Sequence, residues 1–404
     1  MISITNKQEC CGCSACTQRC PKQCISMQAD NEGFMYPIVN ATECIDCGLC
    51  EKVCPVINPN DSQKPIKVYS VINKNKEILM QSSSGGIFTI LAEKTIKKGG
   101  VVFGVRFNEE WQVKFSYAET IDEIAPFRGS KYVQAEIGDA YKKAENFLKQ
   151  GREVLFSGTP CQVAALKKFL RKEYSNLTTI DMFCHGVPSP LVWSIYLQET
   201  YTKLIGAKTI KKDTIISAKS GEYKSGIKAI SFRSKINGWR KYSFLMKLNF
   251  STNDGENTKI FSQPIHSNTY MKAFLSNLSL RPACYKCPAK QGKGASDITI
   301  ADFWGIWNIA PDIDYEKGVG AIFLNTEKGI AAFSNNNCQT KEFTYNDVVR
   351  YNPALIKSSI PHPKRELFFK KIGENANITT LIEKLTRRNI ISRILDKIKI
   401  TIKI

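Results

Sequence analysis

Two runs of cysteines near the start of the chain constrain its fold more than any other feature. The first run reads Cys10-x2-Cys13-x2-Cys16-x3-Cys20-Pro21, and the second repeats it 34 positions later as Cys44-x2-Cys47-x2-Cys50-x3-Cys54-Pro55. In this spacing, three cysteines of one run and the fourth cysteine of the other bind each 4Fe–4S cubane. We therefore predict two clusters, the first on Cys10, Cys13, Cys16 and Cys54 and the second on Cys44, Cys47, Cys50 and Cys20.

Zinc is the alternative metal, because paired Cys-x2-Cys is also a common zinc-binding spacing. Zinc takes four ligands, and it explains neither the third closely spaced cysteine of each run nor the proline after the fourth. The proline stops the local helix, so that the fourth thiolate can reach the other cluster. We favour two cubanes in an α+β, ferredoxin-like domain of residues 1–63. Cys11 and Cys24 fall outside the pattern and are interpreted as packing thiols.

Length, composition and charge narrow the class of protein. The chain has 404 residues, enough for two or three domains, and 43% are apolar, enough for a sizeable core. It has no run of eighteen apolar residues and no apolar signal segment at its start, so we expect a cytoplasmic protein. The formal charge of +20 favours acidic redox partners, an anionic cofactor, a membrane or nucleic acid. Nucleic acid is disfavoured, because no helix-turn-helix, RNA-recognition or zinc-finger signature is present.

A linker rich in proline and small polar residues, from Val56 to Pro65, marks the first domain boundary. From Lys67 to Tyr201, predicted strands alternate with predicted helices, which indicates an α/β domain with a mixed, mostly parallel sheet. From Thr209 to Phe261 the pattern changes to Thr-, Ser- and aromatic-rich segments, typical of an antiparallel insertion. Further strands, at Asp297–Ala301 and Gly320–Asn325, are expected to rejoin the sheet. We place this second domain at residues 64–325.

Residues 326–404 are predicted to form a basic helical extension. From Ile378 to Ile404 the chain carries seven Lys or Arg against two acidic residues, with apolar residues at helical spacing. Such a helix can lie on an anionic membrane surface, so a peripheral membrane contact is one hypothesis. The alternative, which we favour, is a helix whose apolar face packs on its own domain.

Three cysteine motifs stand out beyond residue 63. They are Gly158-Thr-Pro-Cys161, which begins a helix after a strand, Cys184-His185-Gly186, which follows the next strand, and Cys284-x2-Cys287. The carboxyl ends of parallel strands meet at one edge of a sheet, so these cysteines could supply four thiolates to a third cubane. Half a zinc site at the paired cysteines, a catalytic Cys161 with His185 as its base, and simple packing stay open as alternatives.

A serine- and glycine-rich loop precedes the predicted helix at Ile87. Ser82, Ser83, Ser84, Gly85 and Gly86 offer hydroxyl and backbone N–H groups at a helix N-terminus, where the pyrophosphate of a dinucleotide can bind. A flexible turn is the alternative, and neither G-x-G-x-x-G nor G-x-x-x-x-G-K-[ST] is present. The loop from Arg128 to Tyr132 adds two cations, although an ordinary solvated loop would read the same.

Taken in order, these motifs resemble the coenzyme F420 hydrogenase/dehydrogenase beta subunit family, in a form with an N-terminal two-cluster ferredoxin domain. The resemblance runs from about Cys10 to about Trp304, and includes Asp297-Ile-Thr-Ile-Ala-Asp302. It implies a third 4Fe–4S cluster on Cys161, Cys184, Cys284 and Cys287. It also implies FAD at the serine–glycine loop, with Lys131, Gly158 and Thr159 as further cofactor-binding residues. Ser84 stands where the F420-reducing subunits have an acidic residue, which puts F420 itself in doubt as the acceptor.

The predicted function is an iron–sulfur flavoprotein oxidoreductase. Electrons from ferredoxin or another low-potential donor would pass through the 4Fe–4S clusters to FAD and an unidentified small-molecule acceptor. His185 and Asp302 are the candidate catalytic residues, His185 because it is the one histidine near a motif. The alternative is a ferredoxin-like electron-transfer subunit that feeds a separate catalytic partner.

Overall fold

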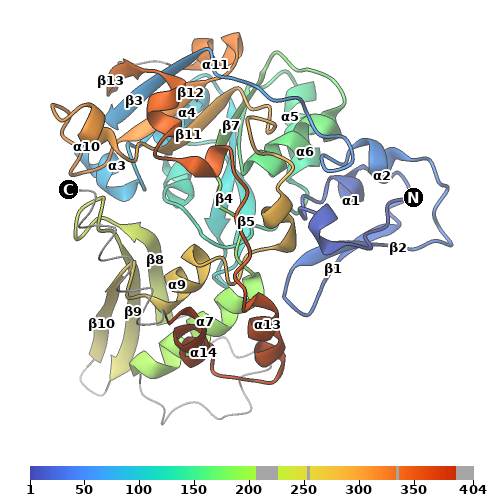
Figure 1. Cartoon of the computed structure of the whole chain (residues 1–404). Coiled ribbons are helices and arrows are strands. Elements are labelled where there is room, and N and C mark those ends of the chain that lie inside the picture. The colour runs from blue at the N-terminus through green and yellow to red at the C-terminus, as the bar shows by residue number, and fades with distance from the viewer. Residues whose placement is uncertain (206–225, 253–254, 334–335, 388–404) are drawn as a thin grey trace.

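The computed structural model describes residues 1–205, 226–252, 255–333 and 336–387. Within these residues the strands form a two-stranded, an eight-stranded and a three-stranded sheet. Figure 1 shows the eight-stranded sheet in the middle, with the N-terminal part beside it and the three-stranded sheet below. The predicted fold class is confirmed: a ferredoxin-like region is followed by a mixed α/β sheet with an antiparallel insertion.

In the N-terminal part, each cysteine run bends into a short helix at its third cysteine. Its elements are η1 (Lys7–Glu9), α1 (Ala15–Arg19), β1 (Ile25–Ala29), β2 (Met35–Val39) and α2 (Leu49–Lys52). α1 contains Cys16 and α2 contains Cys50, and the residue before α2, Gly48, has a positive φ of 69° that turns the chain into the helix. β1 and β2 pair as an antiparallel hairpin between the two runs.

The eight-stranded sheet is mixed. From edge to edge its strands are β13 (Cys338–Phe343), β3 (Lys67–Asn73), β12 (Gly320–Leu324), β11 (Ile298–Asp302), β7 (Leu177–Met182), β6 (Val154–Ser157), β4 (Val101–Phe107) and β5 (Val113–Ala118). β3, β11, β7, β6 and β4 run in one direction, and the other strands run against them. The carboxyl ends of these codirectional strands therefore lie along one edge, where α/β proteins bind their ligands.

Helices cover both faces of this sheet because successive strand residues point to opposite sides. Val102 and Leu155 pack with α4, whereas Phe103 and Phe156 pack with α5 and α6 on the other face. The covering helices are α4 (Ile87–Lys97), α5 (Ala140–Lys149) and α6 (Pro160–Leu170). Shorter elements at the edges are α3 (Lys76–Gln81), η2 (Asp122–Phe127), η4 (Pro282–Lys286) and α10 (Ile306–Ile309).

The predicted insertion is an antiparallel sheet with its own aromatic core. Its strands are β8 (Ile227–Ser234), β9 (Ser243–Thr252) and β10 (Gly255–Pro264), and it packs on α7 (Pro190–Ile205) and α9 (Thr269–Leu275). Trp193, Phe232 and Tyr270 are fully buried in this core. The end of β8 reaches the carboxyl edge of the main sheet, since Arg233 contacts Asp302.

The main sheet extends past the boundary expected at residue 325. β13 pairs with β3, so part of the segment 326–404 belongs to the sheet domain. The later elements are α11 (Glu327–Ala332), α12 (Tyr345–Val349), η5 (Pro353–Leu355), α13 (Arg365–Gly373) and α14 (Ile378–Thr386). α14 packs with α7 and α9 and buries Ile378, Ile382 and Leu385, as the packed alternative predicts. The rest of the predicted basic helix, residues 388–404, lies outside the described residues.

None of the described helices is both long enough and apolar enough to cross a membrane.

Candidate functional site

The predicted ligands of the first cluster lie together. Burial, together with the nearby thiols of Cys10 and Cys54, raises the pKa of Cys16 to about 12. Cys13 lies beside Cys16 and Cys10 as well, and burial raises its pKa. Cys54, from the second run, has therefore crossed to the cysteines of the first run, as the ligand pattern requires.

The predicted ligands of the second cluster line one cavity of about 20 Å³. They are Cys20, Cys44, Cys47 and Cys50. Cys47 is exposed to solvent, whereas Cys50 is buried. Cys24, which the sequence pattern left out, lines the same cavity, with its Sγ 3.4 Å from the Sγ of Cys20. Cys47 thus brings this site to the protein surface.

A second cavity, of about 30 Å³, lies at the carboxyl edge of the main sheet. Its lining includes the four cysteines that the motifs beyond residue 63 singled out: Cys161, Cys184, Cys284 and Cys287. Cys161 lies in the first turn of α6, which Thr159 begins with a capping box, and Cys184 follows the end of β7. Cys284 lies in η4, and Cys287 directly follows it. Strand and helix ends far apart in the sequence thus bring four thiols to one place.

These thiols are costly to ionise without a positive partner. Burial raises the pKa of Cys184 to about 12, and it also raises the pKa values of Cys284 and Cys287. A bound metal reverses this, because a coordinated thiol gives up its proton. None of the fifteen cysteines, all of which lie in described residues, forms a disulfide. The four thiols are therefore chemically suited to bind metal.

The arrangement fits a cluster better than a single ion. Among the residues that the structure describes, no three His, Cys, Asp or Glu side chains are placed to hold one metal ion. In a zinc site every sulfur lies about 2.3 Å from the same metal, so the sulfurs crowd together. A cubane is larger and spaces its four thiolates around its corners. Four cysteine sulfurs around one cavity are the donor set of a 4Fe–4S group.

His185 lies in the wall of this cavity. Its Nε2 is 2.6 Å from Oδ1 of Asn277, and its ring meets the edge of Phe274 with the centroids 5.1 Å apart. Burial lowers the pKa of His185, which favours the neutral ring. The side chain is thus held in place beside the four cysteines.

The serine–glycine loop lies at the same edge, but its side chains bond within the protein. Ser82 donates to the carbonyl of Ile78, and Ser84 donates to that of Val319. A Cβ on Gly85 would lie 1.9 Å from the carbonyl oxygen of Val71, in β3. The space over Gly85 is thus filled by the neighbouring strand. The glycine permits close packing of the loop against β3.

The loop that contains Lys131 joins the serine–glycine loop. The hydroxyl oxygens of Ser83 and Ser130 are 3.0 Å apart, and the backbone N–H of Ser130 donates to Ser83 at 2.7 Å. Lys131 donates to the carbonyls of Pro126 and Arg128. Burial, assisted by the charge of Arg106, lowers the pKa of Lys131 to about 7. Lys131 is therefore only partly charged near pH 7, and a bound anion would favour its charged form.

Gly158 and Thr159 hold the start of α6. The backbone N–H of Gly158 donates to the carbonyl of Ile180 in β7, and that of Thr159 donates to Oε1 of Gln162 at 2.9 Å. The hydroxyl oxygen of Thr159 is 3.3 Å from the Sγ of Cys161. These residues therefore position Cys161.

Sequence reasoning missed Arg233 and Lys235, which approach the edge from the insertion. Arg233 makes a bidentate ion pair with Asp302, at 2.8 and 2.9 Å, and its guanidinium also donates to the carbonyl of Ser83. Lys235 donates to the carbonyls of Leu79, Ser84 and Lys317. The one sequence feature that could have identified Arg233 is its position as a charged residue in a strand that is predicted to be half-buried.

Asp302, a predicted catalytic residue, is held on several sides. Besides Arg233, the indole Nε1 of Trp239 donates to its Oδ1 at 3.0 Å. Trp239 stacks on Trp304 with the ring centroids 4.8 Å apart and the planes 3° from parallel. These contacts favour a positioning role for the carboxylate over proton transfer.

Comparison with known proteins gives three family matches. Two are to the beta subunit of coenzyme F420 hydrogenase/dehydrogenase: the model of its N-terminal part matches residues 68–142, and the model of its C-terminal part matches residues 151–345. A 4Fe-4S dicluster domain matches residues 9–58. A similar solved chain belongs to the F420-reducing NiFe hydrogenase complex of Methanosarcina barkeri, with 17% identity over 79% of this chain and 91% of that chain, and a TM-score of 0.44. No curated protein matches the chain.

Proposed function

This chain belongs to the coenzyme F420 hydrogenase/dehydrogenase beta subunit family, with a 4Fe-4S dicluster domain at its N-terminus. We propose that it passes electrons from that domain to a third cluster and then to FAD. The observation that carries the proposal is the convergence of four cysteines, from α6, β7 and η4, around one cavity. When bound, 4Fe–4S clusters supply single electrons and FAD pairs them for a two-electron acceptor. The family assignment supports the oxidoreductase class.

Electrons are accepted at the second cysteine site in this proposal. Cys47 is exposed there, and Met1 and Ile45 present apolar surface beside it, at 46% and 58% exposure. Lys22 and Lys52 are exposed on the same part of the chain. Glu43 and Asp46 are exposed there as well, and residues 1–63 carry four Lys or Arg against seven Asp or Glu. Attraction of an acidic donor such as ferredoxin would therefore come from the rest of the chain, which gives the overall charge of +20.

FAD is proposed at the carboxyl edge of the main sheet, with its phosphates near the joined loops of Ser83 and Lys131. Gly129 supports this location, because it has a positive φ of 78° and only the carbonyl of Gln81, 3.9 Å away, lies near its missing side chain. An anion there would also relieve the repulsion between Lys131 and Arg106. This places the phosphates one loop away from the paired glycines that the sequence suggested.

His185 is the proposed proton-transfer residue, since it lies in the cysteine cavity and hydrogen-bonds to Asn277. Arg233 holds the backbone of Ser83, Asp302 holds Arg233, and Trp239 donates to Asp302. The three residues thus fix the serine–glycine loop against the insertion. These side chains would bind and orient the FAD, and the flavin would pair the electrons.

Iron and flavin analysis of anaerobically purified protein tests the proposal. We expect about twelve irons per chain, four for each of three cubanes, and about one FAD. Cys161→Ser should lower the iron content to about eight while the two N-terminal clusters remain. About eight irons in the unsubstituted protein, unchanged by Cys161→Ser, would remove the third cluster from the proposal.

A second function is electron transfer to a separate catalytic partner. The observation in its favour is that Arg233 and Trp239 both hydrogen-bond to Asp302. This carboxylate, at the carboxyl edge of the main sheet, is therefore less available to react with a substrate. The family name, a beta subunit, makes a partner protein plausible. Absence of FAD from protein that contains all its iron would favour this alternative.

A further inference from the structure

Arg281 is almost fully buried between the N-terminal part and the main sheet, with 1% of its surface exposed. A buried guanidinium is costly unless its N–H groups and faces have partners. Arg281 donates to the backbone carbonyls of Cys10 and Met35, at 2.7 and 2.9 Å, and to Oε1 of Gln134 at 3.0 Å. Its Cζ also lies 4.3 Å from the ring centroid of Tyr36. The side chain is therefore held firmly in one position.

In that position Arg281 contacts two cysteine sites at once. Its Nη2 lies 3.6 Å from the Sγ of Cys10, a predicted ligand of the first cluster. The same side chain lines the cavity of Cys161, Cys184, Cys284 and Cys287. One fixed positive charge thus faces the first site of the N-terminal part and the site at the sheet edge.

Cys11 makes a second connection between the same two sites. Its thiol lies beside Cys13, a predicted ligand of the first cluster, and beside Cys161 at the sheet edge. Cys11 is buried and lines the sheet-edge cavity. Gln134 ties it to the arginine, since Nε2 of Gln134 donates to the carbonyl of Cys11 while Oε1 accepts from Arg281.

In the part of the chain that the structure describes, the second cysteine site has no lining residue from the main sheet or its loops. Every residue that lines its cavity comes from Met1 to Cys50, within the N-terminal part. It approaches the first site where Cys50 lies near Cys54. The three sites thus form a series: the exposed second site, the buried first site, and the site at the sheet edge.

We infer that the site of Cys10, Cys13, Cys16 and Cys54 is the one that exchanges electrons with the sheet-edge site, and that Cys11 and Arg281 form the junction between them. This inference rests on the proposed function. The step is the movement of one electron, in which the first site is oxidised and the sheet-edge site is reduced by the same amount. No bond forms or breaks, and no proton moves.

The junction makes a specific prediction about reduction potentials. Hydrogen bonds to cluster sulfurs and nearby positive charge stabilise the reduced, more negative state and so raise the potential. Arg281 supplies both to the first site and its charge to the sheet-edge site. Arg281→Met should therefore lower the potentials of two clusters and leave that of the exposed second cluster unchanged. Arg281→Lys keeps the charge and should restore part of the shift.

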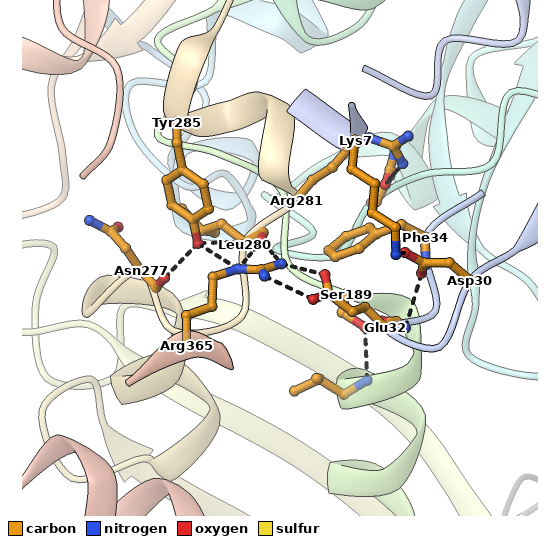
Figure 2. Close-up of polar contacts among 12 residues, drawn as sticks. Lys7, Asp30, Glu32, Phe34, Ser189, Asn277, Leu280, Arg281, Tyr285 and Arg365 are labelled. Atoms are coloured by element: carbon orange, nitrogen blue, oxygen red, sulfur yellow. Dashed lines mark hydrogen bonds and ion pairs between the residues drawn. The ribbon is translucent and has the colours of Figure 1, made fainter. Parts of the chain in front are cut away.

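Arg365 provides a matched control. It is another buried arginine that joins the N-terminal part to the rest of the protein, through Glu32 at 2.9 Å. Figure 2 shows it directed at Glu32, Leu280 and Tyr285, while Arg281 lies by Phe34. Within the described part of the chain, its hydrogen bonds include none to a cysteine sulfur. Arg365→Lys therefore removes an arginine from the same interface, and we expect it to leave the cluster potentials unchanged.

The experiment is a redox titration of the anaerobic full-length protein, followed by electron paramagnetic resonance, with iron counted in every variant. Two lowered potentials in Arg281→Met, smaller shifts in Arg281→Lys and none in Arg365→Lys are expected. If Arg281→Met does not fold, the redox titration of Arg281→Lys tests the junction instead, because it should still show smaller shifts of the same two potentials. Unchanged potentials in a folded Arg281 variant with full iron content would overturn the junction. A deficit of iron in the unsubstituted protein would instead overturn the proposed third cluster.

Cys11→Ser adds a kinetic test of the same junction. Because Cys11 is no ligand in this scheme, the iron content should stay at the unsubstituted level. Reduction of the sheet-edge cluster after rapid mixing with dithionite should slow relative to the first cluster, since the sulfur contact to Cys161 is lost. Loss of about four irons would make Cys11 a ligand, and an unchanged rate would remove it from the junction.

Discussion

Replacing Asp302 by alanine should strongly destabilise the protein, because it leaves the charge of Arg233 buried without its partner. The side chains of Arg233 and Asp302 are only 4% and 19% exposed. Breaking a buried ion pair on one side costs about 3–5 kcal/mol. Arg233 keeps its contacts with the carbonyl of Ser83 and with Tyr242, whose ring centroid lies 4.0 Å from Cζ. We therefore expect the lower end of that range, about 3 kcal/mol.

Urea unfolding of the anaerobic protein, followed by far-ultraviolet circular dichroism, measures this loss. With a dependence on urea of about 1–3 kcal/mol per molar, the midpoint should fall by about 1 M or more. The control is Asp312→Ala, because Asp312 pairs with Lys341 at the surface, where the side chains are 66% and 50% exposed. An exposed pair contributes about 0–1 kcal/mol, so this midpoint should barely move.

A double substitution separates a structural from a catalytic role. Arg233→Met combined with Asp302→Leu removes both charges, and should cost less than the sum of the single changes because neither charge is left alone. If Asp302→Ala unfolds at the same midpoint as Asp312→Ala, the reasoning is refuted. Asp302 would then remain a candidate catalytic residue, as predicted from the sequence.

Three further outcomes are expected. Gly85→Ala should lower the urea midpoint, because its Cβ would meet the carbonyl of Val71 at 1.9 Å. Gly129→Ala would make only an ordinary contact with the carbonyl of Gln81, at 3.9 Å, and should cost about 1–2 kcal/mol for its positive φ. FAD affinity, measured by fluorescence quenching, should fall as pH rises through about 7, where Lys131 loses its proton, and Lys131→Met should abolish that dependence. Reduction by an acidic ferredoxin should slow as salt rises, whereas reduction by dithionite through the same clusters should change less.

Local patterns in the sequence predicted most of the fold. The strands expected from Lys67 to Asn325 are present, because apolar residues in short runs can be buried only in a covered sheet. The convergence of Cys161 and Cys184 followed from strand direction, since codirectional neighbours end at one edge. Periodicity and topology rules were therefore enough to bring Cys161 and Cys184 together, whereas the choice of one site for all four cysteines rested on the family resemblance.

Contacts between distant segments could not be predicted in this way. Arg233 and Asp302 are 69 positions apart, and Arg281 and Cys10 are 271 apart. Each arginine occurs in an unremarkable local sequence, and its role depends on which surface folds against it. For the same reason Cys11 was interpreted as a packing thiol, although its position between Cys13 and Cys161 gives it a more specific environment.

The linker after the second cysteine run marks a domain boundary in the sequence, but the packing indicates that residues 1–63 cannot be removed without loss of stability. Cys11, Ala15 and Val53 share a core with Tyr141 and other residues of the main domain. Further contacts cross between the two parts, from Gln18 to the backbone of Tyr141 and from Glu32 to Arg365.

Deletion of residues 1–63 should therefore expose apolar surface on α5 and α6 and leave Arg281 without the carbonyls of Cys10 and Met35. We expect the truncated protein to aggregate or to unfold at a lower urea concentration than the full chain. Adding the separate 1–63 segment, reconstituted with iron and sulfide, should recover part of the lost stability, because it restores the same contacts. A truncated protein as stable as the full chain would show that the shared core contributes little. The N-terminal part would then be an independent module joined only by its linker.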